Sequence, residues 1–217
     1  MCGLTGLYHP EFKAMYGHLK DVGKIKKVKE KLHEANPGLK KYLQNKRGVL
    51  TINGIHTLHR FYKIAQIINS NDELRVEEIA YSNNSFKSVL GEDYARGILK
   101  LGSIPFEFEI SYRNNKCENG FPIEYETKIF GERGELHVIG WEGCELNFDG
   151  KRTRLYAHPE GHLNGKSHYL RIEIGLREQI KNFFKFIQSG EKIHPTIKES
   201  IEAQKLVEEC YRVAKRD

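Results

Sequence analysis

The helix predicted for residues 51–68 carries two imidazoles and an ammonium group on one face. Ile52, His56, His59 and Lys63 follow one another at spacings of four, three and four residues, which is the repeat of a helical face. Such a face, set beside the apolar stripe of the helix, could line a polar cleft. An imidazole has an unperturbed pKa near neutrality, so His56 could accept a proton from a substrate hydroxyl or donate a hydrogen bond to it. Ordinary surface or half-buried side chains would produce the same spacing, and this alternative stays open.

A second group of candidate ligands lies in the segment HPEGHLNGKSH at 158–168. It holds three histidines and one carboxylate within eleven residues, and these side-chain types bind transition metals. The spacing, however, matches no zinc signature. A polar loop over a cleft, or simple surface exposure, accounts for the same composition. We therefore expect no metal at this segment.

Motifs for nucleophilic catalysis and for phosphate binding are absent from the sequence. Gly-x-Ser-x-Gly does not occur, and no cysteine has an evident partner. Neither Gly-x-Gly-x-x-Gly nor Gly-x-x-x-x-Gly-Lys occurs either. A nicotinamide enzyme needs a glycine-rich loop to seat the pyrophosphate of its cofactor at a helix N-terminus. We expect this chain alone to bind no nucleotide cofactor.

The hydrophobic pattern predicts the helices that position these side chains. A first helix begins at Pro10 and carries apolar residues at helical spacing up to a stop at Gly23. The second helix covers 51–68. Near the end of the chain, an amphipathic stripe over 176–187 predicts a third helix, and a capping box at 196–199 starts a fourth.

Alternation of apolar and charged residues predicts strands between these helices. Residues 106–112 and 123–129 alternate clearly, and Asp149-Gly150 is a strong hairpin signal. The predicted fold class is therefore α+β, with a large, mostly antiparallel, open-faced sheet and helices packed on one face. We expect residues 1–217 to form one domain.

The bulk composition is that of a globular protein. Of 217 residues, 39% are hydrophobic and 29% are charged, which suffices for a sizeable core. No apolar run approaches the roughly 20 residues that span a bilayer, and the N-terminus has no signal-peptide pattern. Four scattered cysteines without a Cys-x-x-Cys pair favour reduced thiols. These features predict a cytoplasmic protein with no membrane partner.

Positive charge is concentrated between Lys20 and Arg47, where ten basic residues stand against three acidic ones. Such a stretch can attract phosphates or nucleic acid. Charge runs usually face solvent, and no nucleic-acid motif accompanies this one. We therefore expect no nucleic-acid partner.

Six segments, in their order and spacing, resemble the C-terminal domain of the glucose-fructose oxidoreductase and inositol dehydrogenase family, Gfo/Idh/MocA. GVLTINGIH at 48–56 is similar to the family's G-x-L-x-D-x-G-x-H helix, and IFGERGEL at 129–136 to its I-x-G-x-x-G-x-L hairpin. The other matching segments are GLYHPEFK at 6–13, GKIKKV at 23–28, EDYARGILKL at 92–101 and the closing helices around 183–196. The resemblance covers essentially the whole chain.

The resemblance implies a role for this domain. In the family, the C-terminal domain holds the substrate, a sugar or polyol, and packs its open sheet against a second subunit. A Rossmann domain that precedes it holds NAD or NADP and a catalytic lysine. His56 occupies the position of a histidine that contacts the reacting hydroxyl. We therefore predict His56 as the catalytic residue and His9, His56, His59 and Lys63 as the substrate-binding residues.

Two positions depart from the family pattern. Ile52 stands where the family has an aspartate beside the reacting hydroxyl, and Leu7 stands where it has an arginine. Isoleucine cannot orient or polarise an imidazole through a hydrogen bond. Hydride transfer also requires a cofactor held against the substrate carbon. We therefore expect no hydride transfer by this chain alone.

Two functions are compatible with these observations. The first is the substrate-side and dimerisation domain of a split or truncated NAD(P)-dependent oxidoreductase, completed by a separate Rossmann-domain polypeptide. The second is a non-catalytic sugar-binding or oligomerisation scaffold derived from that family. Both predict a homo-oligomer formed through the open sheet face, and a polar outer face that simply meets water is the alternative.

Overall fold

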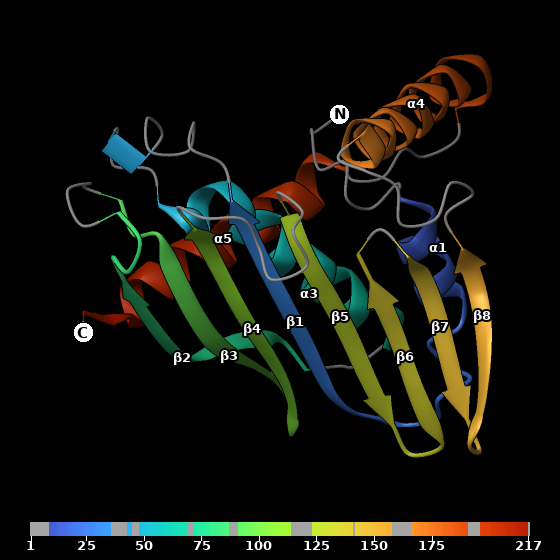
Figure 1. Ribbon diagram of the computed structural model, residues 1–217, viewed down its shortest axis with the longest axis horizontal. Helices are drawn as coiled ribbons and strands as arrows, with labels where there is room; N and C mark the ends of the chain where they lie inside the picture. Colours follow the sequence, from blue (N-terminus) through green and yellow to red (C-terminus); the bar gives the residue numbers. More distant parts are fainter. Residues whose placement is uncertain are drawn as a thin grey trace.

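One nine-stranded sheet forms the centre of the computed structural model (Figure 1), which describes residues 9–35, 43–44, 48–68, 72–86, 91–113, 123–140, 142–157, 166–190 and 196–216. The strands lie side by side in the order β8-β7-β6-β5-β1-β4-β3-β2-β9. Their bounds are β1 Ile25–Ala35, β2 Leu74–Ser82, β3 Tyr94–Leu101, β4 Ile104–Arg113, β5 Ile123–Gly131, β6 Gly134–Ile139, β7 Gly143–Phe148, β8 Lys151–Ala157 and β9 Lys215–Arg216. The predicted α+β fold with a large, mostly antiparallel open sheet is confirmed.

Apart from β9, which pairs in parallel with β2 at one edge, the sheet consists of two antiparallel halves joined by β1. Strands β2, β3 and β4 form one half, and β5 to β8 form the other. β1 pairs in parallel with β4 and antiparallel with β5, so Glu30 stands opposite both Phe108 and Thr127. A strand from the first part of the chain therefore lies in the middle of the sheet.

The hairpin between β7 and β8 forms as its turn residues predict. Asp149 has a φ of 48° and Gly150 a φ of 74°. A two-residue type I′ turn needs positive φ at both central positions, which aspartate tolerates and glycine favours. This turn fixes the register that pairs Phe148 with Lys151.

Three of the described helices pack on one face of the sheet, as predicted. Their bounds are α1 Pro10–Gly17, the π-helical turn η2 Leu50–Gly54, α3 Ile55–Ile68, α4 Lys166–Ser189 and α5 Ile197–Val213. α1 packs against β6, β7 and β8, while α5 packs against α3 and β2. α4 lies beyond the end of the sheet, on the same side as α1 (Figure 1). None of the helices in the described part of the chain combines the length and apolar character needed to cross a bilayer.

Aromatic side chains between the helices and the sheet form the centre of the core. Phe61 of α3 meets Phe106 of β4 edge to face, with ring centroids 5.2 Å apart. Phe12 of α1 stacks on Tyr125 of β5 at 5.7 Å. Such pairs add about 0.5–1.5 kcal/mol to the free energy of burial. They fix α1 on β5 and α3 on β4, the two strands that flank β1.

Two elements differ from the sequence prediction. The first helix ends at Gly17 rather than near Gly23, because hydrogen-bonded turns over 18–22 keep Leu19 and Val22 buried without a regular helix. β2 was not expected from its pattern. The register of β2 against β3 shifts between Val76 and Glu78, so the alternation that marks a strand is interrupted there.

Candidate functional site

The first part of the candidate site lies where α1 begins. His9 is the N-cap residue of α1, and Pro10 follows at the first helical position, where its missing N–H costs nothing. Glu11 is only 3% exposed. Its Oε1 accepts a hydrogen bond of 2.5 Å from the Tyr125 hydroxyl and lies 3.6 Å from Nδ1 of His9. A buried carboxylate therefore lies beside an imidazole and a phenol.

The second part lies where α3 begins, and a side-chain network holds this helix start in place. Oε1 of Glu92 accepts from the backbone N–H of Leu50 at 3.1 Å and from the Tyr211 hydroxyl at 2.7 Å. The network thus joins α5 and the end of the sheet to the π-helical turn at Leu50–Gly54. Single π turns of this kind occur often at functional sites. His56 follows in the first turn of α3.

His56 is held in its neutral form. Burial, together with the nearby Arg60 charge, His59 and His9, lowers the pKa of this imidazole to about 4. Near pH 7 such a ring has one donor and one acceptor nitrogen. His9 is thus within electrostatic range of His56. Two of the predicted substrate-binding residues, at the starts of α1 and α3, are therefore electrostatically coupled.

A buried ion pair between Arg60 and Glu30 holds α1 and α3 against β1. Nε of Arg60 donates to Oε2 of Glu30 over 2.9 Å, and the hydroxyl of Thr127 donates to the same oxygen over 3.1 Å. The guanidinium carbon lies 4.9 Å from the ring centroid of Phe12. Arg60 thus joins α3 to both α1 and β1. Burial also raises the pKa of the neighbouring Tyr16 phenol, which keeps that group protonated.

His59 and Lys63 lie on the side of α3 that faces α5. Nζ of Lys63 is 3.5 Å from Oε1 of Glu199 on α5. His59 is 1% exposed, and burial lowers the pKa of its imidazole to about 4. Within the described part of the chain, Nε2 of His59 has no hydrogen-bond partner. The predicted face therefore divides, because His56 lies toward α1 whereas His59 and Lys63 lie toward α5.

The remaining predicted positions can be placed only in part. Ile52 lies in the π turn and packs, partly buried, against the hydrophobic core. Leu7 and the histidine-containing segment 158–165 lie outside the described residues, as does the side chain of His168. No group of three or more metal-binding side chains exists among the residues that the structure does describe.

Three residues of the site were missed by the sequence analysis: Glu11, Glu30 and Arg60. The signal for Glu30 was present, since it occupies the inward position of an alternating strand between Val28 and Leu32. Arg60 likewise falls among the buried residues of α3. A charge placed on an apolar face indicates a buried partner, but the sequence alone does not name that partner.

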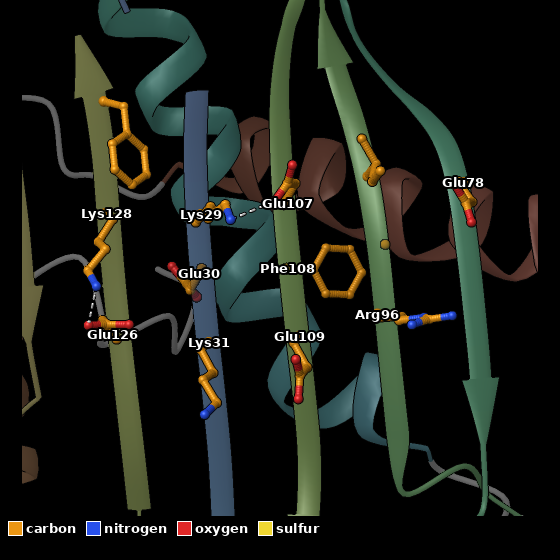
Figure 2. A pocket seen from close by; sticks show the side chains of 13 residues that line it. Lys29, Glu30, Lys31, Glu78, Arg96, Glu107, Phe108, Glu109, Glu126 and Lys128 are labelled. Atoms are coloured by element: carbon orange, nitrogen blue, oxygen red, sulfur yellow. Dashed lines mark ion pairs between the residues drawn. The ribbon is translucent and has the colours of Figure 1, made fainter. Parts of the chain in front are cut away.

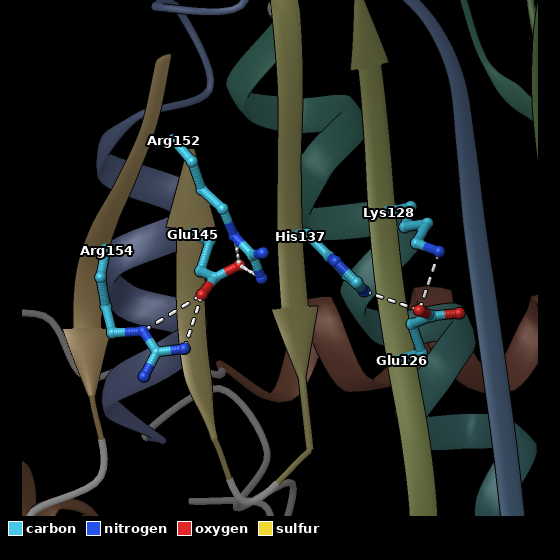
Figure 3. Close-up of polar contacts among 6 residues, drawn as sticks. All are labelled: Glu126, Lys128, His137, Glu145, Arg152 and Arg154. Carbon is cyan, nitrogen blue, oxygen red and sulfur yellow. Dashed lines mark hydrogen bonds and ion pairs between the residues drawn. The ribbon is translucent and has the colours of Figure 1, made fainter. Parts of the chain in front are cut away.

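The open face of the sheet carries a second polar feature. It has a shallow hollow of about 720 Å³ lined by charged side chains of both signs (Figure 2). Glu107 pairs with both Lys27 and Lys29, with a distance of 3.4 Å to Lys29 Nζ. Further along, Glu126 binds Lys128 and His137, and Glu145 binds two arginines (Figure 3). The charges on this face are therefore largely neutralised within the chain, including those of the basic strand.

The starts of α1 and α5 do not fit a dinucleotide cofactor. The α5 start is closed by a capping box, in which Thr196 accepts from the Glu199 N–H at 3.1 Å and the Glu199 carboxylate accepts from the Thr196 N–H at 2.7 Å. That carboxylate would repel a pyrophosphate. The α1 start is occupied by Pro10 and the buried Glu11. We therefore assign no step of chemistry here to a bound nicotinamide.

Comparison with family models and with curated protein sequences finds no match. Several solved structures do match. An oxidoreductase from Agrobacterium radiobacter, in complex with NAD+, L-tartaric acid and magnesium, has a TM-score of 0.77 and 18% identity, over 98% of this chain and 62% of that one. A putative myo-inositol dehydrogenase from Sinorhizobium meliloti has a TM-score of 0.73 and 17% identity, with the same coverage.

A myo-inositol dehydrogenase from Corynebacterium glutamicum gives a similar result, with a TM-score of 0.71, 16% identity, and coverage of 99% of this chain and 62% of the other. Our chain thus spans about three fifths of the length of these proteins. At such identities the likeness shows the fold and leaves activity open. The chain has the fold of the α+β C-terminal domain of the Gfo/Idh/MocA oxidoreductases, which the motifs in its sequence predicted.

Proposed function

We propose that this chain is the sugar- or polyol-binding part of a nicotinamide-dependent oxidoreductase, whose active site a nucleotide-binding domain completes. That domain, on the same polypeptide or on another, holds NAD or NADP. The 217-residue chain by itself then binds the substrate without transferring hydride. The reason is that hydride transfer depends on holding the cofactor carbon against the substrate carbon.

The observation that carries this proposal is the set of polar side chains at the starts of α1 and α3, where Glu11 lies 3.6 Å from His9 and His9 is electrostatically coupled to His56. The neutral His56 ring offers one donor and one acceptor, and the Glu11 carboxylate accepts hydrogen bonds. Neighbouring hydroxyls of a polyol each donate and accept, so they suit such a mixed set. In this proposal, the acceptor nitrogen of His56 takes the proton of a reacting hydroxyl when the nucleotide-binding domain is present.

The solved structures support the same class of substrate. The Corynebacterium protein is a myo-inositol dehydrogenase, and the Agrobacterium protein is in complex with L-tartaric acid. Both small molecules carry hydroxyls on adjacent carbons. The likeness is one of fold, so it supports a polyhydroxylated ligand as a class and does not select a compound.

Isothermal titration calorimetry of the chain with myo-inositol, sorbitol and L-tartrate tests the proposal. We expect saturable binding of at least one ligand, weakened about tenfold or more by His56→Asn and by Glu11→Gln, because a buried polar group left unpaired costs about 1–3 kcal/mol. Lys205→Gln, on an exposed part of α5, is the matched control and should bind normally. No binding by the wild type, or equal binding by all variants, would contradict the proposal.

The second candidate function is a sugar-binding scaffold without catalysis. Ile52 favours it, because this side chain packs against the core and offers no polar group beside His56. Measuring NADH formation in a lysate that lacks the endogenous protein distinguishes the two functions. NADH formed only when the purified chain and polyol are both added supports the oxidoreductase. Polyol binding with no NADH formed under these conditions supports the scaffold.

We also propose that the open sheet face pairs with the same face of a second copy. Lysines on β1 lie beside glutamates on β4, so a two-fold axis can set a positive row against a negative one. Sedimentation velocity should then show a dimer that weakens at high salt, because these charges are partly exposed. Lys29→Glu combined with Lys31→Glu should be monomeric. A wild-type chain that is monomeric at high concentration would contradict this proposal.

A further inference from the structure

Two hairpin turns and the segment after α1 enclose a hollow at the end of the sheet opposite α4 (Figure 1). Its volume is about 310 Å³, and its lining residues are Asp21, Arg133, Leu146, Phe148, Lys151 and Thr153. That volume is at the lower end of the range for small-molecule pockets. None of these residues belongs to the set at the starts of α1 and α3, so the hollow is separate from the candidate site.

The pairing of the strands brings two cations beside an aromatic ring. Gly134 stands opposite Phe148 in the β6–β7 pair, and Phe148 stands opposite Lys151 in the β7–β8 pair. Arg133 precedes Gly134 in the turn between β5 and β6, and its guanidinium carbon lies 5.4 Å from the ring centroid of Phe148. Leu146, two positions earlier on β7, extends the apolar lining. The hollow therefore combines positive charge with an apolar surface.

Arg133 is held in place by contacts that leave part of its guanidinium available. Its backbone N–H donates to the Val22 carbonyl at 2.9 Å, and its Nη2 donates to the Asp21 carbonyl at 3.2 Å. Stacking on Phe148 uses the face of the guanidinium, so further N–H groups along its edge can bind an anion. A side chain that is already fixed loses little conformational entropy when a ligand binds.

Neither of the two cations has an acidic partner among the residues that the structure describes. Arg133 and Lys151 lie beyond ion-pair distance of any carboxylate there. Asp21 lines the hollow, but its Oδ2 lies 2.6 Å from Nδ1 of His18, which does not. By contrast, the arginines of β8 are neutralised by Glu145. Two such cations beside an apolar surface favour an anion that carries an apolar group.

We propose that this hollow binds a small organic anion, a carboxylate or phosphate carried on a planar apolar group. The anionic group pairs with the Arg133 guanidinium and the Lys151 ammonium, and the Thr153 hydroxyl supplies a further donor. The apolar group lies on Leu146 and Phe148, where it loses contact with water. The site is independent of polyol binding at the starts of α1 and α3.

Amide NMR spectra of the full chain, recorded during a titration with phenyl phosphate, test the inference. We expect saturable shifts of the amides that surround the hollow, at 21–24, 133–134 and 146–153. Benzyl alcohol and inorganic phosphate each supply one half of this probe, so each should bind about tenfold more weakly or less. A parallel titration with benzoate compares a carboxylate with a phosphate, and the tighter of the two probes identifies the preferred anion.

Variants of Arg133 test its role directly. Arg133→Gln should weaken phenyl phosphate binding about tenfold or more, because hydrogen bonds between charged groups are the strong ones. Arg75→Gln on β2, whose side chain is 76% exposed, is the matched control and should bind normally. If Arg133→Gln alters the spectrum of the free chain, Arg133→Lys takes its place. Lysine keeps the charge but lacks the planar fork, so it should still weaken binding several-fold.

Titration of His56→Asn with phenyl phosphate separates this inference from the proposed function, because the variant should bind this probe as the wild type does. Four results would overturn the inference. They are no saturable shift around residue 133, an unchanged affinity in the Arg133 variants, a loss of affinity in His56→Asn, and binding of benzyl alcohol or inorganic phosphate as tight as that of phenyl phosphate.

Discussion

Arg60 of α3 and Glu30 of β1 form a hydrogen-bonded ion pair in the interior of the protein, with Nε and Oε2 2.9 Å apart. Arg60 is 6% exposed and Glu30 is 3% exposed. Removing one partner leaves the other charge buried and unpaired, which costs about 3–5 kcal/mol. We therefore expect Glu30→Gln and Arg60→Met each to lower the free energy of unfolding by that amount in urea titrations.

The double variant Glu30→Leu/Arg60→Met provides the control for this prediction. Replacing both charges with apolar groups of similar size is often close to neutral. We expect it to recover most of the stability that either single variant loses. If the double variant lost as much free energy of unfolding as the two single variants together, the stability would not depend on the pairing of the two charges.

The protonation of His56 can be measured directly. Its pKa is lowered to about 4, first by burial and then by the Arg60 charge. Two-dimensional NMR of the imidazole should show a neutral ring from pH 8 down to about pH 5, with His56→Gln identifying the signal. Polyol affinity should stay constant over the same range. A midpoint near 6.5 would mean that the ring is solvated and not part of a closed site.

Three histidines should make the fold sensitive to acid. The pKa values of His33, His56 and His59 are lowered to about 3, 4 and 4, in each case first by burial. Unfolded histidine binds a proton below pH about 6.5, so stability is fully present above that pH and is lost as the pH falls toward 4. We expect a loss of several kcal/mol over this interval in urea titrations, and a loss confined below pH 4 would contradict the assignment.

Because Gly97 of β3 has no side chain, the side chains of Ile79 and Phe108 pack directly against its backbone. A Cβ at this position would lie 2.8 Å from Cε1 of Phe108 and would overlap Cδ1 of Ile79. Gly97→Ala should therefore lower the free energy of unfolding by about 1–3 kcal/mol. Gly17→Ala is the matched control, because a Cβ there meets nothing within 4 Å. Chemical denaturation that finds the two variants equally stable would contradict this account of the sheet.

The sequence predicts an element well where its structure depends mainly on residues nearby in the chain. The 106–112 strand, the Asp149-Gly150 turn and the capping box at the start of α5 are all found where their patterns place them. The first helix and β2 are less predictable. Turns can bury Leu19 and Val22 as well as a helix can, and a bulge conceals the alternation of β2.

The candidate site could be predicted only in part, because it depends on contacts between distant segments. The position of His56 on a polar helix face follows from its spacing. The burial of Glu11 does not, since its carboxylate accepts a hydrogen bond from Tyr125, which lies 114 positions away in the chain. The pattern over 176–187 predicts an amphipathic helix, but it does not predict that the apolar side chains of α4, such as Leu176 and Ile187, are exposed in the structure.

The position of β1 has a consequence for how the chain folds. Each half of the sheet is a meander of neighbouring strands that can form locally, but β1 must pair with β4 and β5, which are synthesised much later. Pairings between distant segments close slowly, because the chain entropy of the loop is lost before the contact is gained. We infer that the pairing of β1 with β4 and β5 limits the folding rate. Before this pairing forms, both halves of the sheet expose strand edges that can pair with other chains.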